Sequence, residues 1–399
     1  MVMRDQFGAA EDPILWLQLA RSRRVGPATF HRLMRAHGSA AAALAALPEI
    51  ARAAGVEHYE VCPMGVVRAE MLRGSKFGAQ LLLWGQAGYP QGLMDLADAP
   101  PLLWALGNLD LLARPCIAMV GARNASSLGL RMAKALAGGL GGAGQVVVSG
   151  LARGIDAAAH EAALRTGTIA VQAGGLDVIY PEENATLSAQ IAAQGLRLCE
   201  HPFGMAPQAR HFPQRNRIVA GLARAVVVVE AAAKSGSLIT ARDAADLGRD
   251  VLAVPGHPFD ARAAGCNGLI RDGAILVRSA ADVLEALGLP PQAAATRAAP
   301  KPMDLAPIDP VPIDPVAAQE GQTAASRAAS PKLRDTHALH AQILARLGPS
   351  PVAEDQLLRD VGAKGAELGQ ALVALELDGA ILRHAGGLIS RLGARPKAV

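Results

Sequence analysis

The chain of 399 residues is poor in aromatic side chains, which make up 3% of it, although 51% of its residues are hydrophobic. That apolar content is enough to bury a core and excludes wholesale disorder. The longest apolar runs, such as Ala225–Val229, are far shorter than the ~20 residues that a membrane helix needs. Acidic residues at Asp5, Glu11 and Asp12 exclude the basic and then apolar pattern of a signal peptide. We therefore expect a cytoplasmic protein with no membrane partner.

Sequence patterns for common catalytic and metal sites are also missing. The four cysteines are far apart and form no CxxC pair, which disfavours both a zinc site and a disulfide framework. There is no GxxxxGK[ST] loop, no GxGxxG dinucleotide fingerprint and no GxSxG elbow. Ser149, Asp156 and His160 fail as a triad because nothing marks the serine as a nucleophile, and we interpret His160 as a structural residue that braces its loop. We expect no catalytic residue, no metal and no cofactor.

Charge excess is absent from the middle of the chain. The net charge is +4, but residues 81–289 contain 17 Lys and Arg against 17 Asp and Glu. A domain that is neutral in sum binds a polyanion only if its charges are segregated on the surface.

Proline and glycine divide the chain into four predicted segments. Residues 1–78 are predicted to form a helical domain of the SAM or helix-hairpin-helix type. Within it, Arg24–Pro27 either offers backbone amides to a DNA phosphate or, as we favour, only connects helices that pack together. Residues 79–289 form the central domain, and 290–332 form a Pro/Ala-rich linker, where proline prevents a packed core. Residues 333–399 show three amphipathic helices and a glycine-turned hairpin, which is a winged-helix pattern.

Short β-branched runs alternate with segments of helical length in the central domain. Such a pattern predicts a mostly parallel sheet covered by helices on both faces. The fold class is therefore α/β, with a Rossmann-like, doubly wound core. The predicted strands are Ile117–Val120, Val146–Ser149, Thr168–Val171, Leu196–Glu200, Val226–Glu230 and Val251–Val254.

Glycine- and serine-rich loops follow several of these strands, where a doubly wound sheet binds its ligand. The segment from His201 to Arg224 adds four arginines, Arg210, Arg215, Arg217 and Arg224, and no acidic residue. Arg123, Arg153 and Lys234 lie in the other loops, and Phe203 and Phe212 are available for stacking. These cations either pair with surface carboxylates or, as we favour for the set, line a groove that neutralises phosphates.

Blocks of residues across about 150 positions resemble those of the DNA processing protein A family (DprA, also called Smf), and they occur in that family's order. They are Ser149–Asp156 with His160, Gly175–Asp177, Tyr180–Pro181 with Asn184, Phe212–Ile218, Lys234–Thr240, Val254–Gly256 and Gly265–Ile270.

The resemblance implies a non-enzymatic binder of single-stranded DNA that protects incoming DNA and loads the RecA recombinase in natural transformation. It also implies a homodimer formed through the Rossmann-like domain. The family's serine and aromatic residue after the first strand are replaced here by Ala122 and Leu128. The expected DNA-binding residues are Gly121, Arg123, Ser126, Ser149, Gly150, Arg153, Gly154, Phe212, Arg215, Asn216, Arg217, Lys234, Ser235, Gly236 and Ser237.

Two other functions fit parts of the sequence. The first is a Rossmann-type nucleotide or nucleoside-phosphate hydrolase, although the PGGxGTxxE signature of that group is absent. The second is a transcription regulator that reads duplex DNA through the winged helix. Its third helix region contains Glu367, Glu376 and Asp378 beside Lys364, so we expect a protein-contact, regulatory or bracing role. Arg383 and His384 remain candidates for a phosphate contact from the wing.

Overall fold

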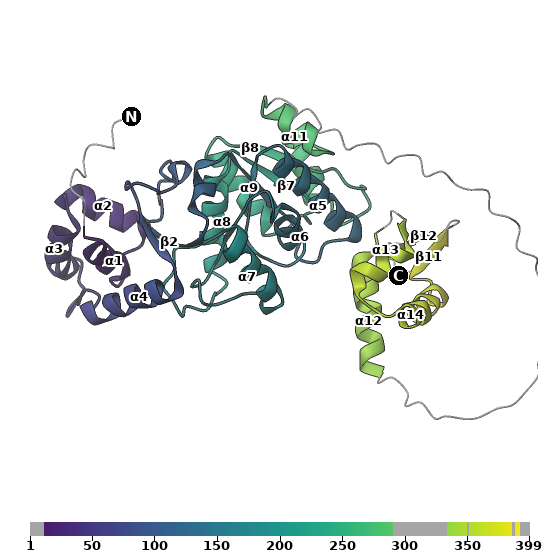
Figure 1. Cartoon of the computed structure of the whole chain (residues 1–399), viewed down its shortest axis with the longest axis horizontal. Helices are drawn as coiled ribbons and strands as arrows, with labels where there is room; N and C mark the ends of the chain where they lie inside the picture. The colour runs from purple at the N-terminus through teal and green to yellow at the C-terminus, as the bar shows by residue number, and fades with distance from the viewer. Residues whose placement is uncertain (1–11, 290–332, 349–350, 385–387, 392–399) are drawn as a thin grey trace, which may run out of the picture.

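A computed structural model describes residues 12–289, 333–348, 351–384 and 388–391 (Figure 1). The predicted linker and the glycine turn of the predicted hairpin lie outside these residues. None of the helices within the described ranges is long and apolar enough to cross a membrane.

Four helices form the N-terminal domain and pack onto one edge of the central sheet (Figure 1). Pro27 begins the second helix directly after Gly26, because a proline at the first helical position has no N–H to satisfy. Glu70 connects the two domains by accepting hydrogen bonds from Arg21 and from the indole N–H of Trp104. The helices are α1 (Pro13–Arg21), α2 (Pro27–His37), α3 (Ala40–Ala53) and α4 (Met64–Phe77).

The central sheet has nine strands in the order β1-β2-β6-β5-β4-β3-β7-β8-β9. Strands β3 to β9 pair in parallel, and β1 and β2 add an antiparallel edge that the sequence pattern did not predict. The predicted parallel core is confirmed, and β4 and β5 have the predicted bounds. The strands are β1 (Gln80–Leu83), β2 (Leu102–Gly107), β3 (Cys116–Val120), β4 (Val146–Ser149), β5 (Thr168–Val171), β6 (Leu196–Cys199), β7 (Ala225–Val228), β8 (Asp250–Ala253) and β9 (Ile275–Leu276).

Both faces of this sheet are buried, which explains why its strands are almost uniformly apolar. Ile117 and Met119 of β3 pack into one hydrophobic cluster, whereas Ala118 and Val120 pack into the other. Each large side chain buried this way stabilises the fold by roughly 1.5–3 kcal/mol. The covering helices are α5 (Ser127–Gly142), α6 (Ile155–Ala163), α7 (Ala185–Gln194), α8 (His211–Leu222), α9 (Ser237–Asp246), α10 (Ala264–Arg271) and α11 (Ala280–Ala286).

The chain changes direction across the sheet at β3. The strands β4, β5 and β6 extend the sheet to one side of β3, and β7, β8 and β9 extend it to the other. Loops at the carboxyl ends of β3 and β7 therefore diverge and leave a crevice between them, which is where doubly wound sheets bind ligands.

The C-terminal domain is a winged helix with its own hydrophobic cluster, made only of residues between Leu339 and Ile389. Its hairpin strands β11 and β12 have the predicted bounds, and the short strand β10 pairs with β12. Arg383 of the wing is held by Glu354 and Glu376, so it is less available to phosphate than expected. The elements are α12 (Leu333–Arg346), β10 (Val352–Ala353), α13 (Glu354–Val361), α14 (Gly365–Leu377), β11 (Ile381–His384) and β12 (Leu388–Arg391).

Candidate nucleic-acid interface

A cavity of about 790 Å³ opens at the crevice between the carboxyl ends of β3 and β7. The loops after β3, β4 and β7 line it together with the first turns of α8 and α9. This cavity joins residues from five separate parts of the sequence, the fifth being Arg262 after β8. The predicted residues in its lining are Gly121, Arg123, Phe212, Arg215, Asn216, Lys234, Ser235, Gly236 and Ser237.

Arg123 and Lys234 are the exposed cations among these lining residues. The guanidinium carbon of Arg123 lies 4.8 Å from the centre of the Phe212 ring, which in turn lies 5.7 Å from the ring of Tyr180 at an angle of 54°. A guanidinium over an aromatic face is attracted to the ring electrons and keeps its edges free to donate. The pair therefore combines a phosphate donor with a surface on which a base can stack.

The loop before α9 contributes the second side of the cavity. The hydroxyl groups of Ser235 and Ser237 are 2.7 Å apart, and the Leu238 N–H donates to the Ser235 carbonyl. These hydrogen bonds within the loop hold it as a tight turn. The positive end of the ten-residue α9 dipole faces the loop and favours an anion there.

Three further predicted residues lie next to this cavity. Gly150 and Arg153 line a small hollow beside Tyr180 and Phe212, and Arg153 and Gly154 line a second cavity of about 690 Å³. Arg153 also forms an ion pair of 3.3 Å with Glu183, but both side chains are more than half exposed. Such an exposed pair is weak, about 0–1 kcal/mol, and leaves Arg153 able to exchange the carboxylate for a phosphate.

The loop between β4 and α6 is held by side chains whose role is structural. One Asp156 carboxylate oxygen accepts the N–H groups of Gly150 and Ala152, and the Asn184 amide donates to the carbonyls of Leu151 and Ala152. Gly154 has a φ of +73°, and a Cβ there would overlap the backbone of the β3 loop. The two loops are therefore fixed against each other.

Arg215 has a different role from the phosphate contact that we expected. Its side chain is buried, and it donates to the carbonyls of Gly150 and Val171 and to the Asn216 amide oxygen. Burial lowers the pKa of Arg215 and raises that of the nearby Asp156 carboxyl, and each residue opposes the shift of the other. Arg215 lines the cavity, but most of its donors hold the loop in place.

Family models match three successive parts of the chain. They are described as a DprA-like N-terminal HHH domain (residues 10–72), DNA recombination-mediator protein A (80–288) and a DprA winged helix domain (327–387). The chain belongs to the DNA recombination-mediator protein A family. The family resemblance and the fold class expected from the sequence are thereby confirmed, as is the helix-hairpin-helix type of the first domain.

Individual relatives in this recombination-mediator family agree. The chain is 50% identical over 198 residues to the DNA processing protein DprA of Streptococcus pneumoniae, covering 49% of this chain and 70% of that protein. It is 44% identical over 202 residues to the protein of the same name from Bacillus subtilis, covering 50% of this chain and 68% of that protein. The X-ray structure of the S. pneumoniae protein superposes with a TM-score of 0.58 at 36% identity, covering 69% of this chain and 98% of that one.

Not every arginine expected at the family's DNA-binding loops faces them. Arg217 is buried on the other side of α8, where it pairs with Glu200 at 2.6 Å and with Asp98 at 3.1 Å. Arg224 directly precedes β7 and lies at the amino edge of the sheet, since its backbone N–H donates to the carbonyl of Cys116 at the start of β3. Arg210 is exposed before α8 and contacts His211.

Two serines and one aromatic residue are also placed differently from the expectation. The Ser149 hydroxyl is buried and donates to the carbonyl of Met119. Ser126 caps α5 and binds the carboxylate of Glu230, whose negative charge repels a phosphate. Phe203 packs edge-on against Trp104 in the core, so it is not available for stacking on bases.

The remaining polar candidates have structural positions. His160 is fully buried and bonds Thr168 of β5 at 2.7 Å, so it braces the sheet more than the loop. Burial lowers its pKa to about 3, which keeps the ring neutral. All four cysteines are buried, and their thiols are free. Within the described residues no cluster of three or more His, Cys, Asp or Glu side chains is arranged to hold a metal ion.

Arg262, Asn124 and Tyr180 line the interface but were not among the predicted residues. Arg262 follows β8 in a segment that also contains Asp260, so it did not stand out by charge. Its position after a strand of the parallel core was the signal that would have identified it.

Proposed function

We propose that this chain binds single-stranded DNA, without turnover, through the cavity between the β3 and β7 loops. The observation that carries the proposal is the convergence of Arg123, Lys234 and the positive end of α9 on one cavity of a domain with no excess charge. A segregated positive surface of this kind neutralises phosphates independently of base sequence. Phe212 adds one stacking surface, in keeping with the low aromatic content.

The bound strand is then passed to the RecA recombinase during DNA uptake, and the protein acts as a homodimer through its Rossmann-like domain. These two parts of the proposal rest on the family to which the chain belongs. Protection of incoming DNA follows from the same binding, because a strand held in the cavity is shielded from nucleases.

Action by binding is favoured over hydrolysis by the roles of the polar groups. Asp156 is the carboxylate lining the cavity among the described residues, and one of its oxygens is engaged by the N–H groups of Gly150 and Ala152, which fix it in its loop. A general base needs a carboxylate that is free to take a proton from water. Turnover of a nucleoside monophosphate by the purified protein would contradict this part of the proposal.

The test is fluorescence anisotropy of labelled oligo-dT over a salt series, with a duplex of equal length for comparison. If Arg123, Arg153 and Lys234 each neutralise one phosphate, log K falls against log salt with a slope of about −2. Arg123→Ala should weaken binding and reduce the slope by about 0.7, whereas Arg224→Ala, at the opposite edge, should change neither. Equal losses in both variants, or tighter binding of duplex, would contradict the proposed site.

A further inference from the structure

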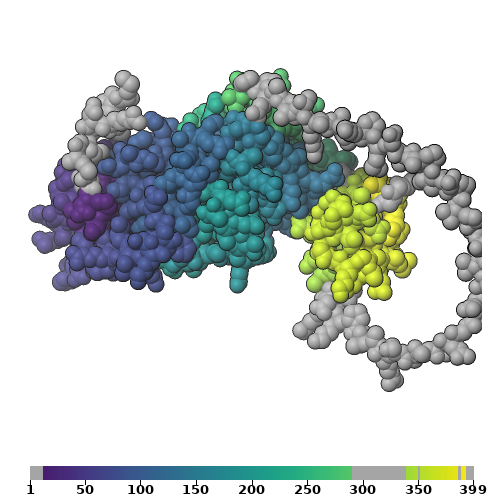
Figure 2. Space-filling view, in the orientation of Figure 1, coloured from purple at the N-terminus to yellow at the C-terminus, as the bar shows by residue number. Residues whose placement is uncertain are grey.

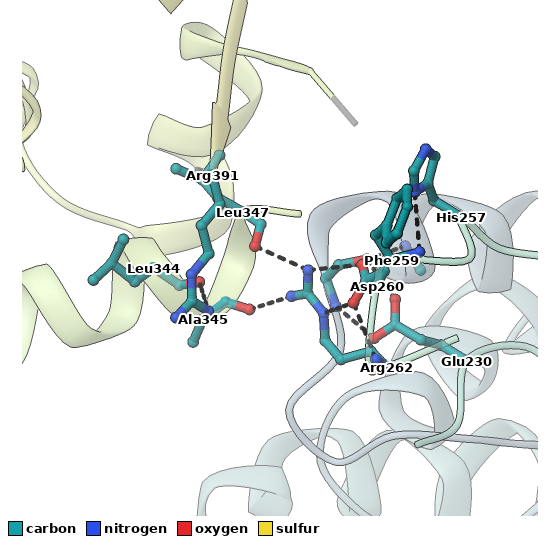
Figure 3. Close-up of polar contacts among 11 residues, drawn as sticks. Glu230, His257, Phe259, Asp260, Arg262, Leu344, Ala345, Leu347 and Arg391 are labelled. Carbon is teal, nitrogen blue, oxygen red and sulfur yellow. Dashed lines mark hydrogen bonds and ion pairs between the residues drawn. The ribbon is translucent and has the colours of Figure 1, made fainter. Parts of the chain in front are cut away.

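Two arginines, one from each domain, join the winged-helix domain to the core, and Figure 3 shows the one from the core, Arg262. Arg262 of the core donates to the carbonyls of Ala345 and Leu347 at 2.7 and 2.9 Å. Arg346 of α12 donates in the other direction to the carbonyl of Ala125, at 2.8 Å. These bonds join residues far apart in the sequence and fix the winged helix against the carboxyl edge of the sheet.

The contact uses the backbone carbonyls at the end of α12. The last carbonyls of a helix lack intrahelical partners and carry the negative end of its dipole. Arg391 of the same domain donates to the Leu344 carbonyl, and Arg262 of the core donates to the carbonyls of Ala345 and Leu347. Asp260 holds the Arg262 guanidinium in position with bonds of 3.0–3.1 Å. The core therefore supplies part of the C-terminal cap of this helix.

The same arginine belongs to the candidate DNA site. Arg262 lines the cavity that contains Arg123 and Lys234. The neighbouring cavity of about 690 Å³ has Arg123 and Arg153 on one wall and α12 and α13 on the other. Figure 2 shows the yellow winged-helix domain seated against the blue part of the core. A strand that extends from one cavity to the other would meet this domain.

Asp360 of α13 adds a negative charge to the winged-helix wall of that second cavity. One of its carboxylate oxygens is buried and has no hydrogen-bond partner. A carboxylate that shares a cavity with Arg123 and Arg153 attracts these cations and repels an incoming phosphate. Arg346 lies on the same wall, but its guanidinium donates to the Ala125 carbonyl of the core. The docked domain thus presents the Asp360 carboxylate, beside a cation already engaged by the core, where the DNA backbone would lie.

The contact is built so that it can open. The winged helix has its own hydrophobic cluster, and the clusters of the core contain none of its residues, so separation exposes no core. The arginine bonds between the domains involve backbone carbonyls that water can satisfy after separation. Residues 290–332 connect the domain covalently to the core, so it stays part of the same molecule after separation.

We infer that the winged-helix domain is a displaceable cover of the DNA-binding edge, and that it competes with single-stranded DNA for Arg262 and the adjoining loops. This inference rests on the proposed function. When the cover is docked, the Arg262 donors are engaged by α12. When it leaves, they face the cavity and are available to a phosphate.

The first experiment compares two variants of the full chain that each remove one positive charge from the winged helix. Arg346→Ala removes the bond to Ala125, whereas Arg359→Ala changes an exposed residue whose side chain contacts Gln356 within the same helix. Because docking reduces the fraction of protein able to bind, Arg346→Ala should tighten oligo-dT binding by roughly three- to tenfold. Arg359→Ala should leave it unchanged. Weaker binding by Arg346→Ala would show that the domain extends the DNA site, and unchanged binding would also overturn the inference.

A second measurement tests docking without depending on oligo-dT affinity. Hydrogen–deuterium exchange of the full chain should be faster in residues 260–265 and 345–348 for Arg346→Ala than for Arg359→Ala, with no DNA present. Saturating oligo-dT should increase exchange in the same peptides of the wild-type protein. Equal exchange in both variants refutes the docked cover. Different exchange in a protein that binds no oligo-dT refutes the proposed function and leaves the docking contact intact.

Discussion

Replacing Arg217 by alanine separates a structural arginine from those that we propose to bind DNA. Its side chain is 11% exposed and pairs with a Glu200 side chain that is equally buried. Removing one partner of a buried ion pair leaves the other charge unpaired, which costs about 3–5 kcal/mol. The variant should therefore unfold at a much lower urea concentration while its folded fraction keeps its affinity for oligo-dT.

The pH dependence of this loss gives a second check. Burial raises the pKa of Glu200, and Arg217 opposes that rise, so removing the arginine raises the pKa further. When the folded-state pKa of a carboxyl is raised, the protein becomes less stable as pH rises, since the carboxyl must then ionise in the folded state without a partner. The difference in unfolding free energy between variant and wild type should be larger at pH 8 than at pH 5.5.

The assay is urea unfolding followed by circular dichroism, with Arg224→Ala as the control. Arg224 is exposed at the amino edge of the sheet, so its loss should change the unfolding free energy by less than about 0.5 kcal/mol. The double variant Arg217→Ala with Glu200→Gln should recover part of the loss, because no charge is then left buried. An Arg217→Ala protein of near wild-type stability with weakened DNA binding would refute this assignment.

Two other predictions concern buried polar groups. Asp156→Ala leaves the N–H groups of Gly150 and Ala152 without their acceptor, so it should lower the free energy of unfolding by about 1–3 kcal/mol. It should also weaken oligo-dT binding in the anisotropy assay. Unchanged stability and unchanged binding would contradict the bracing role. Burial lowers the pKa of His160 to about 3 and of His201 to about 4. The unfolded chain takes up protons near pH 6.5 and the folded one does not, so stability falls between pH 7.5 and pH 5 by about 2 kcal/mol for each histidine. His160→Gln should remove its share, and an unchanged pH profile would argue against a neutral buried ring.

Local patterns were enough to predict most of the parallel core. Val146–Ser149 and Thr168–Val171 are short β-branched runs buried on both faces, so burial left a continuous apolar signal in the sequence. The antiparallel strands β1 and β2 were not predicted, because β2 joins the sheet through contacts with β6, which is distant in the sequence. The loops with Arg123 and Lys234 were predicted correctly as neighbours, since parallel strands end at one edge.

The sequence by itself determined the family, the fold class and the edge of the sheet at which the candidate loops lie. These depend on strand periodicity and on glycine and serine at turns, which are local properties. Only the tertiary structure decided which arginines face that edge. Arg215 and Arg217 are two residues apart on one helix, yet one braces a loop of the cavity and the other is paired with Glu200 beneath the N-terminal domain. The position of Arg262 between the cavity and the winged helix likewise depends on domain packing, because charge and spacing along the chain carry no record of which distant carbonyls a guanidinium will meet.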